Sequence, residues 1–186
     1  MRIISGSLKG RSINFVKNST TRPLKDVVKE NIFNILKHSK LINVKIENSH
    51  ILDLYSGIGS FGIECISRGA SKVVFVEKNK NSSNILKKNI TKLSIEEKTK
   101  VLNDKIDNVL NMFDNKDFDI FFLDPPFADK DFIKILNLIK NKKIFNSDHI
   151  VIIHRDVRTN DNLKNYLSEI MIKKYGRSKI IFGVFN

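Results

Sequence analysis

The chain has 186 residues, 41% of them hydrophobic, which suffices to bury the core of one domain and excludes wholesale disorder. Its 33 Lys and Arg against 20 Asp and Glu give a net charge of +13. This excess indicates a polyanionic partner, nucleic acid before a membrane surface, although a genomic bias toward Lys and Asn is the alternative. The single cysteine, Cys65, excludes an internal disulfide, and we expect a small core residue there. Without a membrane-spanning apolar run or a signal-peptide pattern, the sequence predicts a cytoplasmic protein.

The first 22 residues are basic and contain no acidic side chain. Strand-like pieces at 2–5 and 11–16 predict a small β-arm, or hairpin, ahead of a main domain spanning 23–186. A segment of this size cannot bury a core alone, so it packs on the main domain or becomes ordered on a ligand. We expect RNA contact, with a solvated hairpin edge as the alternative. The side chains expected to contact RNA are Arg2, Lys9, Arg11 and Arg22.

From residue 50 onward, buried-type strands alternate with amphipathic helices, which predicts an α/β domain. The expected strands are residues 51–54, 72–77, 100–103, 118–123, 150–153, 169–175 and 178–185. The expected helices are residues 23–38, 61–68, 79–93, 104–112, 131–140 and 160–167. Together they predict a mostly parallel, seven-stranded sheet that ends in an antiparallel hairpin. In the helix 23–38 we expect Asp26, Lys29 and Glu30 to lie on a solvated face.

The organising stretch is residues 50–62, where a short apolar strand meets a glycine-rich turn and then a helix. Gly57, Gly59 and Gly62 permit a sharp turn and a close approach of the backbone to a ligand at the helix N-terminus. This spacing alone does not separate a dinucleotide site from other nucleotide-like sites. Asp53, at the end of the strand, would repel a pyrophosphate and would suit the ammonium and sulfonium charges of S-adenosylmethionine.

Carboxylates also follow the next strands, where ligands of open α/β sheets bind. Glu77 lies 20 residues beyond Gly57, the usual place for an acid that accepts from ribose hydroxyls. Asp104 is placed to accept from an adenine amino group. The loop completes the expected donor site, whose residues are Asp53, Tyr55, Ser56, Gly57, Gly59, Glu77 and Asp104.

The run Asp124-Pro125-Pro126-Phe127 after the fourth strand is the more specific signal. Its prolines fix the backbone and leave carbonyl groups free of neighbouring N–H groups. A carboxylate and a prolyl carbonyl that accept both N–H groups of a base amine would localise the nitrogen lone pair toward a methyl donor. Phe127 would stack on the flipped base. The sequence therefore predicts methyl transfer to an exocyclic base amine; a rigid turn is the structural alternative.

The chain resembles the RsmD family, the bacterial 16S rRNA guanine-N2 methyltransferases. The resemblance rests on Arg2-Ile3-Ile4-Ser5-Gly6, Lys9-Gly10-Arg11, the helix after Arg22-Pro23, the donor loop, Asp124 to Phe127 and Lys173-Lys174-Tyr175-Gly176. It covers nearly the whole chain. It implies a Rossmann-like class I S-adenosylmethionine-dependent methyltransferase fold, with S-adenosyl-L-homocysteine (SAH) as product. It also implies methylation of guanine 966 (rRNA numbering) at N2 in 16S rRNA of the assembling small subunit. We expect a monomer.

The sequence departs from the family at Leu24, where Thr is usual, and at Val27, where a basic residue is common, so RNA contacts are not carried over to them. A DNA or RNA adenine-N6 or cytosine-N4 methyltransferase, a non-catalytic RNA-binding assembly factor and a nicotinamide-dependent oxidoreductase are the alternatives. We interpret His154, Arg155 and Asp156 as loop residues. The histidines lack metal-ligand spacing, so we expect no metal site.

Overall fold

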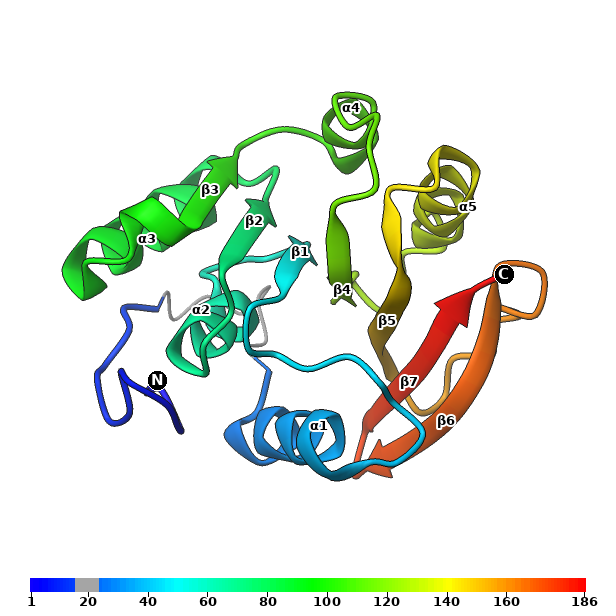
Figure 1. Ribbon diagram of the computed structural model, residues 1–186, viewed down its shortest axis with the longest axis horizontal. Coiled ribbons are helices and arrows are strands. Elements are labelled where there is room, and N and C mark those ends of the chain that lie inside the picture. Colours follow the sequence, from blue (N-terminus) through cyan, green and yellow to red (C-terminus); the bar gives the residue numbers. More distant parts are fainter. Residues whose placement is uncertain (16–23) are drawn as a thin grey trace.

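The computed structural model describes residues 1–15 and 24–186 (Figure 1). The strands are β1 (His50–Leu54), β2 (Lys72–Val76), β3 (Thr99–Leu102), β4 (Phe118–Leu123), β5 (Phe145–Asp156), β6 (Leu167–Tyr175) and β7 (Ser178–Phe185). The α-helices are α1 (Asp26–His38), α2 (Ser60–Ser67), α3 (Lys80–Leu93), α4 (Ile106–Leu110) and α5 (Phe132–Lys142), and Glu96–Lys98 form a 3-10 turn. None of these helices is long and apolar enough to cross a membrane.

All seven strands join one sheet in the order β3-β2-β1-β4-β5-β7-β6. Strands β1 to β5 pair in parallel, whereas β7 is antiparallel to both β5 and β6. The mostly parallel sheet with an antiparallel C-terminal hairpin is thus confirmed. The strand order reverses between β1 and β4, and a crevice forms at the carboxyl ends of strands on either side of such a point.

Helices cover both faces of the sheet, so the central strands are buried on both sides (Figure 1). Ile51, Phe75 and Phe122 pack in a core with α1, α2 and α3, which also encloses Cys65 as expected. Leu52 and its counterparts in neighbouring strands pack with α4 and α5. Successive strand side chains point to opposite faces, which explains why these strands appear in the sequence as continuous apolar runs.

Two predictions for the last third of the chain are wrong. Residues 160–167 contain no helix, because Asp161 is drawn into a buried ion pair with Arg155 and accepts a hydrogen bond from Thr159. Strand β5 begins five residues before the expected Ile150 and continues through Asp156. His154, Arg155 and Asp156 are therefore buried residues of a strand and not loop residues, since partners elsewhere in the chain satisfy their polar groups.

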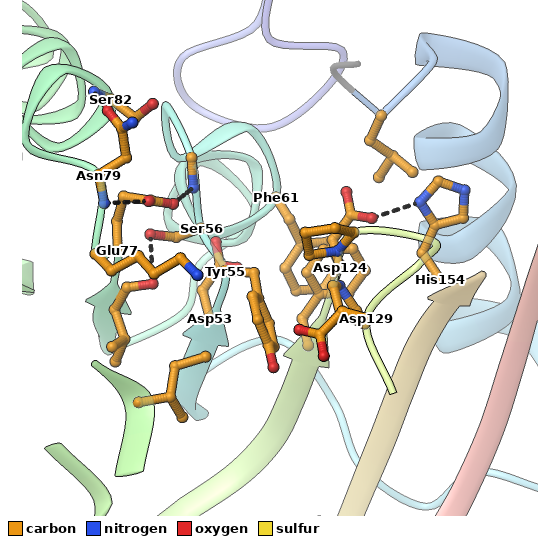
Figure 2. Close-up of a pocket in the computed structure, with 18 of the residues that line it drawn as sticks. Asp53, Tyr55, Ser56, Phe61, Glu77, Asn79, Ser82, Asp124, Asp129 and His154 are labelled. Atoms are coloured by element: carbon orange, nitrogen blue, oxygen red, sulfur yellow. Dashed lines mark hydrogen bonds and ion pairs between the residues drawn. The ribbon is translucent and has the colours of Figure 1, made fainter. Parts of the chain in front are cut away.

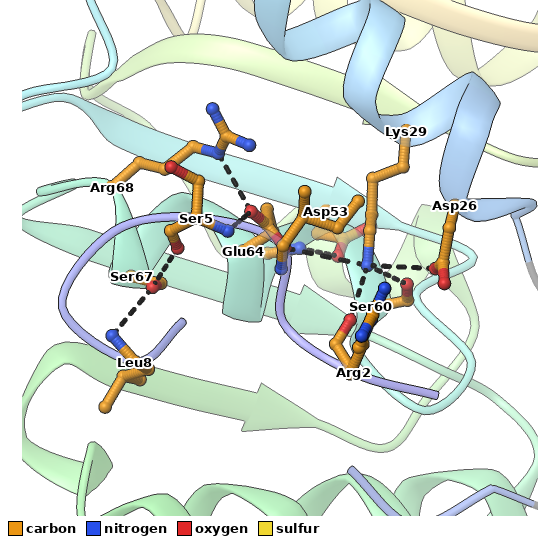
Figure 3. A network of polar contacts seen from close by, with 12 residues as sticks. Arg2, Ser5, Leu8, Asp26, Lys29, Asp53, Ser60, Glu64, Ser67 and Arg68 are labelled. Atoms are coloured by element: carbon orange, nitrogen blue, oxygen red, sulfur yellow. Dashed lines mark hydrogen bonds and ion pairs between the residues drawn. The ribbon is translucent and has the colours of Figure 1, made fainter. Parts of the chain in front are cut away.

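The described part of the N-terminal arm packs on α2 (Figure 3). Of the expected strand pairing, the described residues show one antiparallel bridge, between Arg2 and Ser12. The arm is also held by polar contacts with α2 and α3, and the Asn14 N–H donates to Asn89 of α3 at 2.7 Å. Ser67 accepts a hydrogen bond from the Leu8 N–H at 3.0 Å and donates one to the Ser5 carbonyl at 2.5 Å. Residues 16–23, and with them Arg22 and the start of the predicted helix, lie outside the described residues.

A buried carboxylate, Glu64, joins the arm to the two helices beside it (Figure 3). It accepts hydrogen bonds from the backbone N–H groups of Ile4 and Ser5 at 2.8 and 2.9 Å and from Arg68 at 2.9 Å. The ammonium group of Lys29 lies 3.6 Å away. Lys29 is only 1% exposed, so its predicted place on a solvated face is wrong. Fully buried, Glu64 compensates the charge of Lys29 and two backbone donors of the arm.

We expect Glu64→Gln to lower the free energy of unfolding by about 3–5 kcal/mol, because the buried ammonium group of Lys29 then keeps only the half-exposed carboxylate of Asp26, 3.8 Å away, as its counter-charge. The amide nitrogen of Gln would also face a donor in at least one of these contacts. Urea denaturation measures the change, with Glu97→Gln at an exposed position as the matched control. A loss below about 1 kcal/mol, typical of an exposed ion pair, would contradict this role.

Candidate active site

A cavity of about 920 Å³ opens at the carboxyl ends of β1, β2 and β4, beside the reversal of strand order (Figure 2). It brings together the glycine-rich loop and the proline motif, which are far apart in the sequence. The predicted site residues that line it are Asp53, Tyr55, Ser56, Gly57, Glu77, Asp124, Pro125, Pro126 and Phe127. Gly59 and Asp104 are not among its lining residues.

The glycine loop needs glycine because the chain turns tightly between β1 and α2. Gly59, the N-cap of α2, has a φ of +85°, and a Cβ there would lie 2.3 Å from Leu86 of α3. The Gly62 N–H, in the first turn of α2, donates to Asp53 Oδ2 at 3.0 Å. The loop therefore packs closely against α3 at Gly59, and the hydrogen bond from Gly62 to Asp53 joins the start of α2 to the end of β1.

Asp53 is the most deeply buried acid in the lining of the cavity. It is 1% exposed, and its Oδ1 has no hydrogen-bond partner among the described residues. Burial, together with the nearby Asp124 and Glu77 carboxylates, raises the pKa of Asp53 well above its usual range, although the Gly62 N–H opposes the shift. A desolvated carboxyl group with one free oxygen on a cavity wall suits a cationic ligand group.

Glu77 is held firmly at the end of β2. Its Oε2 accepts from the Gly57 N–H at 2.8 Å, and its Oε1 accepts from the Asn79 N–H at 2.7 Å (Figure 2). Ser56 fixes the other side of the loop, since its N–H donates to the Val76 carbonyl at 3.1 Å. Each carboxylate oxygen keeps a second lone pair, so Glu77 remains able to accept from a ligand hydroxyl.

Two further residues of the predicted donor site differ in placement. Asp104 is exposed, and its carboxylate accepts from the Lys105 N–H and from Asn108, in the first turn of α4. Tyr55 lies on the cavity wall with a left-handed φ of +60°, unusual for a residue other than glycine. Burial and the neighbouring Asp129 carboxylate raise the pKa of the Tyr55 phenol, which therefore stays neutral.

At the other end of the cavity, Asp124 follows β4 and is paired with His154 of β5. His154 Nδ1 lies 2.8 Å from Asp124 Oδ1 (Figure 2). His154 Nε2 lies 3.0 Å from the hydroxyl of Ser178. The ring of Phe127 meets the imidazole edge to face, with centroids 5.5 Å apart. The carboxylate of the motif thus has one fixed oxygen, while Oδ2 receives no hydrogen bond from the described residues.

Arg155 fixes the backbone of the same motif from the next position of β5. Its guanidinium donates to the carbonyls of Pro126 and Phe127, both at 3.1 Å, and to both oxygens of Asp161. It also lies over the ring of Phe132, 4.5 Å from the centroid. The sequence interpretation did not include His154 and Arg155 in the site. Both directly follow the apolar run 150–153, and polar residues at strand ends are the same signal that identified Asp53, Glu77 and Asp124.

The residues expected to contact RNA lie outside the cavity where the structure describes them. Arg2, Lys9 and Arg11 are exposed, and none of them lines the cavity. Arg11 donates a hydrogen bond to the carbonyl of Lys92, at the end of α3, at 2.8 Å. This hydrogen bond helps to hold the arm against α3. The arm reaches the cavity instead through Phe15, which is 46% exposed.

No group of three or more His, Cys, Asp or Glu side chains within 1–15 and 24–186 is placed to hold a metal ion.

Comparison with known proteins identifies the family. A family model described as Conserved hypothetical protein 95 matches residues 1–184. The chain belongs to this family, the RsmD family. The predicted resemblance is therefore confirmed. The ribosomal RNA small subunit methyltransferase D of Buchnera aphidicola (Acyrthosiphon pisum) is 36% identical over 154 residues, which cover 83% of this chain and 77% of the relative.

Solved structures confirm the fold class. The Escherichia coli protein yhhF superposes with a TM-score of 0.82 at 24% identity, over 100% of this chain and 98% of that chain. The protein SMU.776, solved in complex with SAH, matches with a TM-score of 0.64 at 14% identity, over 84% of this chain and 49% of that chain. The fold is that of the Rossmann-like class I methyltransferases.

We expect Asp53→Asn to stabilise the ligand-free protein at neutral pH, because Asn keeps an acceptor for the Gly62 N–H without a buried charge. The raised pKa of Asp53 fixes the sign. The unfolded carboxyl ionises from about pH 4, while the folded one resists ionisation, so its cost to stability is absent below this pH and grows above it. Urea denaturation from pH 4 to 8 should show the two proteins diverging as pH rises. A difference independent of pH would contradict the assignment.

Proposed function

We propose that this protein uses S-adenosylmethionine to methylate the exocyclic N2 amine of guanine 966 in 16S rRNA during assembly of the small subunit. The observation that carries the proposal is one cavity that has a buried Asp53 at one end, whose Oδ1 has no hydrogen-bond partner among the described residues, and a fixed Asp-Pro-Pro-Phe motif at the other. The names of the relatives support rRNA as the acceptor. The proposal includes a cytoplasmic, monomeric enzyme.

The residues at the donor end fit S-adenosylmethionine. The free Oδ1 of Asp53 would pair with the ammonium group, and the remaining lone pairs of Glu77 would accept from the ribose hydroxyls. Tyr55, Ser56 and Gly57 would border the donor along the loop. Asp104 would reach the adenine amine only by giving up its hydrogen bonds to Lys105 and Asn108.

The acceptor end offers two free acceptors for a base amine. Asp124 Oδ2 is one, because His154 engages Oδ1. The Pro125 carbonyl is the other: Arg155 engages the carbonyls of Pro126 and Phe127, and no described residue donates to that of Pro125. Accepting both N–H groups of the amine would turn its lone pair toward the donor end. Phe127 would stack on the flipped base.

Positioning is the main catalytic contribution of these residues. When bound, S-adenosylmethionine supplies a methyl group on a sulfonium, and SAH remains after the carbon–sulfur bond breaks. Asp124 would hold the amine of the acceptor in position for the transfer. After transfer the amine carries one proton too many, and the carboxylate of Asp124 is placed to accept it.

Binding of the RNA itself would use the basic arm. Arg2 and Lys9 are exposed, make no ion pair with described residues and would contact phosphates. Arg11 would contact RNA while it also donates a hydrogen bond to the end of α3. Arg22 remains part of the proposal from its sequence alone. Two alternative functions differ in their use of the acceptor end. Methylation of adenine N6 or cytosine N4 would also use Asp124 Oδ2 and the Pro125 carbonyl, whereas a non-catalytic assembly factor would need neither group.

The direct test is transfer of a labelled methyl group to undermodified small subunits, naked 16S rRNA and DNA, followed by mapping of the modified base. We expect label in small subunits or 16S rRNA, at N2 of one guanine. Label at an adenine or cytosine amine would favour the corresponding alternative. Absence of transfer to all three acceptors would favour the assembly factor.

For the donor end we expect Asp53→Asn to weaken S-adenosylmethionine binding by about tenfold or more, because the ammonium group loses its counter-charge. Titration calorimetry on the same variant that is used for unfolding separates this loss from misfolding. A variant that is more stable yet binds the donor less well would agree with both expectations; unchanged affinity would contradict the donor site.

For the acceptor end we expect Asp124→Ala to reduce methyl transfer by at least about a hundredfold while donor affinity stays within a few-fold of wild type. The amine would lose one of its two acceptors and the group that takes its proton. Asp148→Ala, at an exposed position outside the cavity, is the matched control. Retained turnover in Asp124→Ala would remove Asp124 from the mechanism.

A further inference from the structure

A chain of three side chains leads from the proline motif into the sheet. It starts at Asp124, after β4, passes through His154 of β5 and ends at Ser178, the first residue of β7. The side chain of His154 is 8% exposed, so solvent does not compete strongly for its two ring nitrogens. Both of these nitrogens have a protein partner at hydrogen-bond distance.

The partners select one tautomer of the imidazole. An ionised carboxylate can only accept, so Nδ1 of His154 must carry the proton that is donated to Asp124 Oδ1. In the neutral imidazole Nε2 then holds a lone pair, which accepts from the hydroxyl of Ser178, a group that is able to donate. The opposite tautomer would set a lone pair on Nδ1 against the carboxylate.

The same strand also fixes the backbone that follows Asp124. Arg155 holds the carbonyls of Pro126 and Phe127. Neighbouring residues of a strand point to opposite faces, so His154 and Arg155 reach the motif from its two sides. One fixes the carboxylate and the other fixes the loop, and the part of the motif that remains free to meet the acceptor is Asp124 Oδ2 with the Pro125 carbonyl.

We infer that His154 is a positioning residue for methyl transfer. Its Nδ1–H holds Asp124 Oδ1, so that Oδ2 faces the acceptor amine, and Ser178 holds the imidazole in the required tautomer. This inference rests on the function proposed above. His154 itself touches neither donor nor acceptor in this role; its effect passes through the carboxylate.

Two substitutions separate the hydrogen bond from the ring. His154→Phe keeps an aromatic ring beside Phe127 but removes the donor, whereas His154→Asn keeps an N–H near the position of Nδ1 and removes the ring. We expect His154→Phe to lower kcat about tenfold to a hundredfold, with donor affinity unchanged, because a mispositioned acceptor group slows the chemical step. His154→Asn should recover most of the rate. His38→Asn, at the exposed end of α1, is the control.

Wild-type kcat in His154→Phe, or equal losses in both variants, would overturn the inference. A second measurement does not depend on activity: long-range proton–nitrogen NMR of the wild-type protein should show a proton on Nδ1 of His154. Asp124→Ala should abolish this preference. An Nε2–H tautomer in the wild type would overturn the inference. Inactive wild-type protein with the expected NMR signature would instead contradict the proposed function and leave the pairing of His154 with Asp124 confirmed.

Discussion

The buried carboxylate of Glu64 is the interaction on which the candidate site depends. It compensates Lys29 of α1 and the backbone of the arm from within α2, the helix that begins at the glycine loop. Lys29 in turn lies 3.5 Å from the hydroxyl of Ser60, the first residue of α2. One ion therefore joins the arm, α1 and the start of α2. Phe15 of the arm and Leu24, just before α1, line the wall of the cavity.

The two ends of the cavity treat their carboxylates in opposite ways. Asp53 is left with an unpaired buried oxygen, which costs stability and can be compensated when a cation binds. Asp124 is paired in advance by His154, so its free oxygen is oriented before any ligand arrives. Under the proposed function, the first arrangement favours affinity for a charged donor. The second favours rate, because orientation that is already present in the free protein need not be gained in the transition state.

The sheet and the glycine-rich loop between β1 and α2 could be predicted from the sequence because they depend on local pattern. Apolar runs mark strands that are buried on both faces, and glycine spacing marks the turn. The errors arise where distant partners override that pattern. The sequence pattern puts Lys29 on the solvated face of a helix, but in the structure Lys29 is buried and pairs with Glu64. The pattern also predicts a helix at 160–167, where the structure instead has an ion pair between Arg155 and Asp161. Asp104 follows a strand end as expected, yet its own hydrogen bond to Asn108 holds it outside the cavity lining.

His154 could also have been assigned to the site from the sequence, by applying to β5 the rule that was applied to the other strands. Polar residues at the carboxyl ends of parallel strands meet at one edge of the sheet, and this rule brought Asp53, Glu77 and Asp124 together. Strand β5 runs parallel to β4 and is its neighbour, so a polar residue at the end of β5 must lie beside the residue that follows β4. The apolar run 150–153 ends directly before His154. The same reasoning that found the carboxylate therefore also locates its partner, once β5 is allowed to continue into its polar residues.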